Sequence, residues 1–262
     1  MTGRIRYGAR SDEERRAALL RREEAPPVWS EAVNAVWETD PEAVAAVLPR
    51  PLQPGERPLV RATITRVEMA GMVFGAGYFA VSARHEGEAG EYPLLMPMTS
   101  ERAMTGGRET FGEPKKMGTV EVAVEGDGGT GAAVTAVMAR LGVDLVSVSG
   151  RLGDPVEPPP ERTKKDFYFK FLLDPSGKGF DEEPALVHCT KVERIRSIRP
   201  IESGSVVLGD SPFDPVADLP VVAMVELTHQ ERSTLQRGEI VTRVPSDWIL
   251  PFAHQRYDDP LP

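Results

Sequence analysis

The chain has 262 residues, of which 40% are hydrophobic and 27% charged, with a formal net charge of −9 and a sequence pI near 5.1. This composition excludes a largely disordered chain, which would carry fewer large apolar residues and a steeper charge imbalance. The acidic balance argues against a nucleic-acid partner, and the single cysteine, Cys189, excludes an internal disulfide and favours the cytoplasm.

The N-terminal segment is rich in charged residues. Ser11 is followed by three acidic residues, which is a helix-start signal, and Pro26 and Pro27 end the predicted helix. The segment lacks the apolar core of a signal peptide, and no later run reaches the roughly 18 apolar residues of a membrane span. We therefore expect residues 1–27 to form a helical extension that is solvated or contacts another subunit, and residues 28–262 to form a single domain without membrane contact.

A second short helix is expected to begin at Asp40, with Pro41 in its first turn, and to stop before Pro49. Strand signals dominate after it. No regular helices of 10 to 15 residues alternate with the strands, so a parallel βαβ fold is excluded and a mostly antiparallel α+β fold is predicted. The runs that are β-branched or aromatic, several with period-two alternation, are residues 59–69, 71–84, 119–125, 144–150, 166–173, 185–198, 221–231 and 239–244.

The stretch Gly126 to Gly131, "GDGGTG", matches the dinucleotide-binding pattern G-x-G-x-x-G. It lies in the middle of the chain without a βαβ context, although "AAVTAVMARLG" after it could pass for a helix. Glycines also supply the positive φ angles of a hairpin turn. We favour the hairpin, and a nicotinamide oxidoreductase remains a weak alternative.

Two further site types lack a sequence signal. The four histidines show no His-x-x-x-His spacing, and the lone cysteine cannot complete a zinc motif. No G-x-S-x-G motif of a serine hydrolase is found. We therefore expect neither a metal site nor a serine nucleophile.

The chain contains two pairs of adjacent lysines, at 115–116 and at 164–165. Lys164 and Lys165 follow "EPPPERT", and we expect them to form a solvated basic patch at the end of a loop. Lys115 and Lys116 instead stand between the apolar run "YPLLMPM" and the alternating strand "MGTVEVAV", directly after Pro114. Because successive side chains of a strand point to opposite faces, one lysine of this pair can point inward.

An inward lysine must either pair with an opposite charge or lose its proton. Lowering a lysine pKa from about 10.4 to about 7 costs roughly 4–5 kcal/mol, at about 1.36 kcal/mol per unit. Such a cost is tolerated mainly where an unprotonated amine serves a reaction, for example attack on a carbonyl carbon.

The residues around the first lysine pair resemble the signature of the acetoacetate decarboxylase family. The matching positions are Gly107, Arg108, Glu109, Gly112, Pro114, Lys115, Lys116 and Gly118. Similar segments extend the resemblance over roughly residues 28–258, beyond the charged N-terminal helix. It implies a cone-like, mostly antiparallel β-barrel with short flanking helices, assembled as a homo-oligomer without a metal or an organic cofactor.

The resemblance also implies roles for these residues. Lys115 would form a Schiff base with a small carbonyl compound, and Lys116 would help to keep Lys115 neutral. Either Glu109 or Glu113 could move a proton in the site. We place Glu109 in the catalytic group, although pairing with an arginine is an equal alternative, and we assign Arg108 and Glu113 to substrate binding.

The sequence departs from the family at the positions that surround the substrate carboxylate. Ser30, Thr63 and Ala80 stand where the decarboxylases carry an arginine and two glutamates, and Glu113 replaces an aromatic residue. We therefore expect a Schiff-base lyase that acts on a keto acid or a related carbonyl compound, by decarboxylation or by aldol and dehydration chemistry. The alternative is a small-molecule-binding protein of the same fold without turnover.

Overall fold

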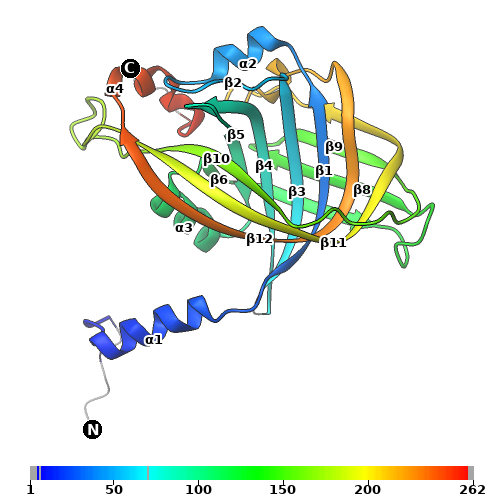
Figure 1. Cartoon of the computed structure of the whole chain (residues 1–262), viewed down its shortest axis with the longest axis horizontal. Coiled ribbons are helices and arrows are strands. Elements are labelled where there is room, and N and C mark those ends of the chain that lie inside the picture. The colour runs from blue at the N-terminus through cyan, green and yellow to red at the C-terminus, as the bar shows by residue number, and fades with distance from the viewer. Residues whose placement is uncertain (1–4, 6, 70, 259–262) are drawn as a thin grey trace.

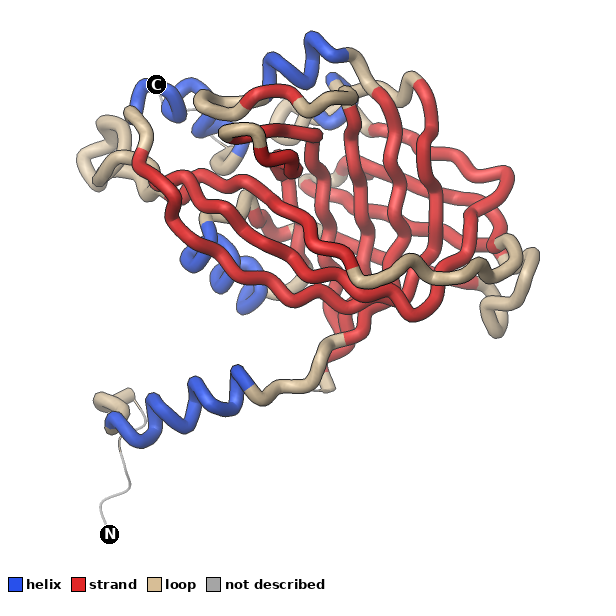
Figure 2. Tube along the Cα trace, viewed as in Figure 1, coloured by secondary structure: helices blue, strands red, loops and turns tan. Residues whose placement is uncertain are grey.

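The computed structural model describes residue 5, residues 7–69 and residues 71–258 of the chain. Strands make up most of it (Figure 2), and within this part none of the helices combines the length and apolar character needed to cross a lipid bilayer. The α-helices are α1 (Asp12–Glu23), α2 (Pro41–Val47), α3 (Glu101–Phe111) and α4 (Ser246–Ile249), and two 3₁₀ segments are η1 (Val216–Asp218) and η2 (Leu250–Gln255).

The strands follow one another through the rest of the chain, mostly as hairpins. Their bounds are β1 (Trp29–Glu38), β2 (Gln53–Pro54), β3 (Leu59–Met69), β4 (Met72–His85), β5 (Glu88–Met98), β6 (Lys115–Met117), β7 (Thr119–Val124), β8 (Ala133–Arg140), β9 (Val143–Leu152), β10 (Arg162–Lys170), β11 (Ala185–Leu208) and β12 (Ala223–Arg243).

The first two helices begin as the sequence predicts. The Ser11 hydroxyl accepts a hydrogen bond from the Glu14 backbone amide, and the Glu14 carboxylate accepts one from the Ser11 amide, which completes a capping box. Asp40 caps α2 through the Glu42 amide, with Pro41 in the first turn. Figure 1 shows α1 projecting away from the strands, whereas α2 lies over one end of them.

Seven strands pair along a path that returns to its start. The order is β10-β5-β4-β3-β1-β12-β11, and β11 pairs again with β10. All neighbours are antiparallel except β5 and β10, which meet in parallel at Glu91 and Asp166. The second half of β11 leaves this ring and pairs with β9, and the sheet goes on from β9 to β8 and β7. The observed sheet agrees with the mostly antiparallel barrel that the resemblance implies.

The two faces of the ring differ in chemistry. One face packs the main apolar core against β7 to β9, with Trp37, Ile64 and Phe79 fully buried and Met138 reaching them from β8. We call the other the polar face; in the pairing register it carries Asn34, Thr63, Tyr78, Asp166 and Lys191, with their partners. Buried polar groups need partners, so this face must be extensively hydrogen-bonded.

The polar face is concave. The Lys191 ammonium on β11 lies 4.7 Å from the centre of the Tyr78 ring on β4. Along the ladder β5 and β10 separate these two strands, so their side chains can meet only if the sheet curves around them.

The strands differ from the sequence-based prediction in several places, among them β1 and β12. β1 was not among the predicted strands, because "WSEAVNAVWE" mixes alanine and charge with its apolar residues. The runs 221–231 and 239–244 are parts of one strand, β12, because a single long ladder with β1 and β11 holds both. The hairpin at "GDGGTG" is confirmed: it joins β7 to β8, and Gly126, Gly128 and Gly131 all have positive φ.

A buried histidine pair lies beside the core. His85 Nδ1 and His188 Nε2 are 2.9 Å apart, and the Phe167 ring packs against His188 at 4.9 Å between ring centres. Burial lowers the pKa of His188, and His85 and Lys165 act in the same direction.

This pair predicts a pH dependence of stability. Because unfolding restores an ordinary histidine pKa of about 6.5, the unfolded chain takes up a proton that the folded His188 resists. The contribution is therefore complete above about pH 6.5 and is lost as the pH falls below it. We expect His188→Gln to lose less thermal stability than the wild type between about pH 7.5 and pH 5, whereas His254→Gln, at an exposed histidine, should follow the wild type. Equal slopes for all three proteins would contradict this.

Candidate active site

The lysine pair lies on a short strand that a helix and a tight turn position. Ser100 caps α3 through the Ala103 amide, and Gly112 ends the helix with a φ of 81°, a conformation that favours glycine. A Cβ at Gly112 would also lie 2.6 Å from the Lys170 Cα, so the turn packs tightly on β10. Pro114 follows, and β6 then runs parallel to β5 with Lys115 opposite Met96.

The two lysines point to opposite sides, as strand alternation predicts. The Lys115 side chain is 12% exposed, and its Nζ lies 2.7 Å from Glu113 Oε2. It also donates a hydrogen bond of 3.3 Å to the Ala103 carbonyl oxygen. Glu113 Oε2 is buried without a hydrogen bond, so its contact with Lys115 is one of opposite charges and not of donor and acceptor alignment. Lys115 is thus a nearly buried amine that faces one carboxylate.

Glu113 is held in place from two directions. Its side chain is 1% exposed, and its Oε1 accepts a hydrogen bond of 3.1 Å from Gln236 on β12. Gly107 of α3 leaves the space for both charged groups, because a Cβ there would lie 1.9 Å from Glu113 Oε2 and 2.6 Å from Lys115 Nζ. A glycine, a glutamate and a lysine therefore fit together as one unit.

Lys116 belongs to a different cluster, of two cations and two carboxylates. Its Nζ lies 2.9 Å from Asp214 and 3.2 Å from Asp258, and its side chain is 5% exposed. Arg140 contacts the same two aspartates. Each charge has two partners of opposite sign, so the cluster fixes Lys116, and with it the direction of β6.

The other two motif residues contact neither charged group of the Lys115–Glu113 pair among the described residues. Arg108 donates a hydrogen bond of 2.9 Å to the Lys115 carbonyl oxygen, and its guanidinium lies 5.4 Å from the centre of the Tyr257 ring. Glu109 is exposed on α3. Arg108 thus supports the backbone of the lysine turn, and the substrate-binding role of Arg108 and the catalytic role of Glu109 stay predictions.

Several charged residues that sequence reasoning missed share the polar face with Lys115. Glu91 accepts hydrogen bonds from Arg61 at 2.6 Å and from the Tyr78 hydroxyl at 2.9 Å. Asp166 accepts bonds from Lys191 and, at 2.7 Å, from the Tyr168 hydroxyl. Strand alternation offers a signal for such residues. A charged residue two positions from a buried residue lies on the same face of its strand, as Asp166 does with Tyr168.

Ser30, Thr63 and Ala80, which the sequence predicts to depart from the family, lie along this same face. Thr63 pairs with Asn34 and with Tyr78, Ala80 pairs with Arg61, and Ser30 pairs with Arg232. Charged residues, Arg61 and Arg232 among them, therefore stand next to these positions on the face.

The expectation for the second lysine pair is wrong. Lys164 and Lys165 lie within β10 and are ion-paired with Glu193 and Glu88, respectively. Burial lowers the pKa of Lys164 to about 8, with help from Arg61 and against the pull of Glu193. The strand begins before the apolar run, so these lysines are part of a sheet and not of a solvated loop.

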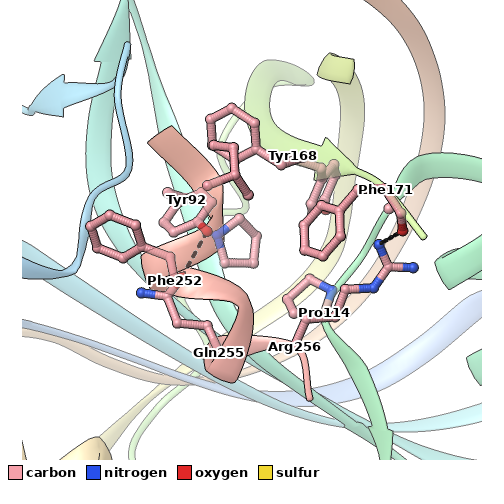
Figure 3. Close-up of a pocket in the computed structure, with 11 residues that line it drawn as sticks. Tyr92, Pro114, Tyr168, Phe171, Phe252, Gln255 and Arg256 are labelled. Carbon is pink, nitrogen blue, oxygen red and sulfur yellow. Dashed lines mark hydrogen bonds between the residues drawn. The ribbon is translucent and has the colours of Figure 1, made fainter. Parts of the chain in front are cut away.

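A pocket lies where β5, the turn before β6, β10 and η2 meet (Figure 3). Tyr92 and Pro114 border it, the Tyr92 hydroxyl donates a hydrogen bond of 2.8 Å to Gln255, and Arg256 donates one of 2.8 Å to the Phe171 carbonyl oxygen. Lys115 and Glu113 are not among its lining residues. A carbonyl compound in this pocket would therefore not face the Lys115 amine.

The chain is similar to known proteins over most of its length. A family model described as acetoacetate decarboxylase matches residues 12–244. The acetoacetate decarboxylase of Chromobacterium violaceum is 30% identical over 206 residues, which cover 74% of this chain and 78% of that protein. The acetoacetate decarboxylase of Streptomyces nogalater is 39% identical over 100 residues, which cover 37% of this chain and only 40% of that protein.

Solved structures show the same fold. Acetoacetate decarboxylase from Legionella pneumophila superposes with a TM-score of 0.70 at 21% identity, covering 84% of this chain and 88% of that one. The enduracididine biosynthesis enzyme MppR, complexed with pyruvate, superposes with a TM-score of 0.66 at 18% identity, covering 84% and 92%.

The space at Gly107 gives a test of the packing around Lys115. Alanine normally stabilises a helix interior by about 1 kcal/mol relative to glycine. Gly107→Ala should instead lower the free energy of unfolding by about 1–3 kcal/mol, because the new methyl group overlaps Glu113 and Lys115. Gly106→Ala is the matched control, since a Cβ there meets nothing within 4 Å. Urea unfolding measures both, and a Gly107→Ala protein as stable as Gly106→Ala would show that the pair yields without cost.

The Lys116 cluster gives a second test. Lys116→Met leaves two aspartates facing Arg140 alone, so we expect the free energy of unfolding to fall by about 3 kcal/mol, as when one partner of a buried ion pair is removed. Lys165→Met removes a more exposed ion pair with Glu88 and should cost less than about 1 kcal/mol. Similar losses for the two variants would argue against a special structural role of Lys116.

Proposed function

Because the chain belongs to the acetoacetate decarboxylase family, we propose that it is a Schiff-base-forming lyase in which Lys115 attacks a keto acid or a related carbonyl compound. The observation that carries the proposal is that the first lysine of the motif is a nearly buried amine beside a single carboxylate, Glu113. The second lysine, Lys116, is paired with Asp214 and Asp258 in a separate cluster and acts on the site through the position of β6.

Glu113 supplies the means to generate the nucleophile. As an ion pair, Lys115 is an ammonium group and has no lone pair for attack. Transfer of one proton across the 2.7 Å contact to Glu113 would give a neutral amine and a neutral carboxylic acid. The amine nitrogen then bonds to the carbonyl carbon, and one of its protons moves to the carbonyl oxygen to give a carbinolamine. Glu113 returns its proton to the hydroxyl group, which leaves as water, and a protonated imine remains.

The protonated imine can then accept an electron pair. In a 3-oxo acid, the bond to the carboxylate carbon breaks, carbon dioxide leaves and an enamine forms. In a 2-oxo acid, loss of a proton next to the imine carbon gives the corresponding enamine, which can add to an aldehyde and later lose water. The proposal includes both reactions. Family membership supports the first, and the complex of MppR with pyruvate shows that a protein of this fold binds a 2-oxo acid.

The remaining motif residues act on the lysine turn. Lys116 positions β6 through its aspartates, and Arg108 holds the Lys115 carbonyl oxygen. Glu109 is exposed in the last turn of α3, from where it could donate a proton only to a ligand that reaches this surface.

The wider setting is also part of the proposal. We assign the protein to the cytoplasm, where Cys189 stays a free thiol, and to a homo-oligomer that works without a cofactor. Residues 1–27 form an extension and residues 28–262 one catalytic domain; the projecting α1, with Leu19 and Leu20 exposed, suits a contact with another copy.

Trapping of the imine tests the function. Incubation with pyruvate or acetoacetate and sodium borohydride should add mass to the peptide that contains Lys115, as read by mass spectrometry. Lys115→Arg keeps a cation beside Glu113 but should abolish the adduct, and Lys165→Met should retain it. Glu113→Gln should slow labelling at least about tenfold, because the proton acceptor is lost.

Absence of an adduct with a broad panel of carbonyl compounds would reject the lyase. If such compounds still stabilised the protein against heat, the result would support the binding protein of the same fold.

A further inference from the structure

Lys191 is a second lysine of the polar face that the lysine motif does not include. Its side chain is 15% exposed, and its Nζ contacts the Asp166 carboxylate and lies 4.7 Å from the centre of the Tyr78 ring. The side chain is therefore mostly, but not fully, buried.

Lys191 faces the same space as Lys115. Gln236, which binds Glu113, lies directly opposite Lys191 in the ladder of β11 and β12. Cys189, two residues before Lys191 on the same face, lies within electrostatic range of both Lys115 and Lys191. Its thiol packs in an apolar cluster with Met96, which is the β5 partner of Lys115. Cys189, Met96 and Gln236 therefore lie beside both lysines on this face.

The other cations of this face have strongly ionised partners. Burial alone would raise the pKa of Glu91, but Arg61 and neighbouring cations lower it to about 2. Glu193 behaves in the same way: burial is outweighed by Arg232, Lys164 and Arg162, which lower its pKa to about 2. Arg61, Arg232 and Lys164 are thus held by carboxylates that keep their charge.

Asp166 is a weaker counter-ion. Burial raises the pKa of Asp166, and the opposing effect of Lys191 does not offset it. Burial also acts to lower the pKa of Lys191, but the Asp166 carboxylate raises it, so the cation persists while its partner is the group that can be neutralised. The Tyr168 hydroxyl remains bonded to Asp166 and can hold that residue when its contact with Lys191 is lost.

From this arrangement we propose that Lys191 binds the acid group of the substrate whose carbonyl carbon Lys115 attacks. The assignment rests on the proposed function and makes the substrate an oxo acid in preference to a neutral ketone. The incoming carboxylate replaces Asp166 as the partner of Lys191, and the Tyr78 ring lies beside the ammonium group. Lys191 is thus the cation that substitutes for the carboxylate anchors absent at Ser30, Thr63 and Ala80.

A matched pair of carbonyl compounds tests this. Pyruvate and its methyl ester differ in the acid group and share the ketone, so the dependence of Lys115 labelling on their concentration in the presence of cyanoborohydride separates the two contacts. Lys191→Met should raise the half-saturating concentration of pyruvate by roughly tenfold to hundredfold, the equivalent of a charged hydrogen bond of about 1.5–3 kcal/mol, and change that of methyl pyruvate less than about twofold.

Two further variants guard against a loss of structure. Lys191→Met combined with Asp166→Asn removes both charges of the pair, so a folded protein with the same selective loss of pyruvate is expected. Asp166→Asn alone leaves Lys191 without a competing carboxylate and should lower the half-saturating concentration of pyruvate. Lys164→Met is the control, because Lys164 lies opposite Lys191 in β10 but is paired with Glu193.

The outcomes are distinguishable. Equal effects of Lys191→Met on both compounds, or the same selective loss in Lys164→Met, would overturn the assignment of Lys191 while leaving the lyase intact. If the wild type is labelled by neither compound nor by other ketones, the proposed function itself is overturned, and this assignment with it.

Discussion

The site depends on the alternation of one three-residue strand. β6 directs Lys115 to the polar face and Lys116 to the opposite side, so two ammonium groups that are adjacent in sequence have separate partners. Among the residues that the structure describes, Lys116 contacts two aspartates that Arg140 also contacts, whereas the charged partner of Lys115 is Glu113. Lys116, with its two ion pairs, fixes the position of β6. Lys115, with one ion pair, remains available for chemistry.

The polar face follows from the cost of burying charge. Each cation on it contacts a carboxylate, as Arg61 does with Glu91, Lys164 with Glu193 and Lys191 with Asp166. An unpaired buried charge would cost several kcal/mol, so such a face folds only if its charges balance. A charged ligand on this face would have to replace one of these partners, as proposed for Asp166 beside Lys191.

The sequence predicted the local features of the fold well. Capping residues identified α1 and α2, alternation identified most strands, and glycines identified the turn at Gly126. It also placed Glu113 and Lys115 in one site, because the motif is contiguous. The sequence does not predict the contact between Lys191 and Asp166, because it joins β10 to β11. Their position on the same face as Lys115 depends on how the ring of strands closes. The prediction for Lys164 is wrong because the proline-rich stretch before it indicates a loop. Pairing with β11 instead starts the strand at Arg162, before Lys164.

The carboxylate at position 113 changes how the amine must be activated. A lysine in an apolar pocket loses its proton to bulk solvent because burial penalises the ammonium, and this requires a site that stays free of anions. Glu113 instead lies 2.7 Å from the nitrogen and is close enough to take its proton, so activation becomes an internal transfer. Entry of an anionic substrate beside Lys191 would bring negative charge toward Glu113, the group proposed to take the Lys115 proton. Binding of an oxo acid and release of the nucleophile would then be coupled through the same small group of buried charges.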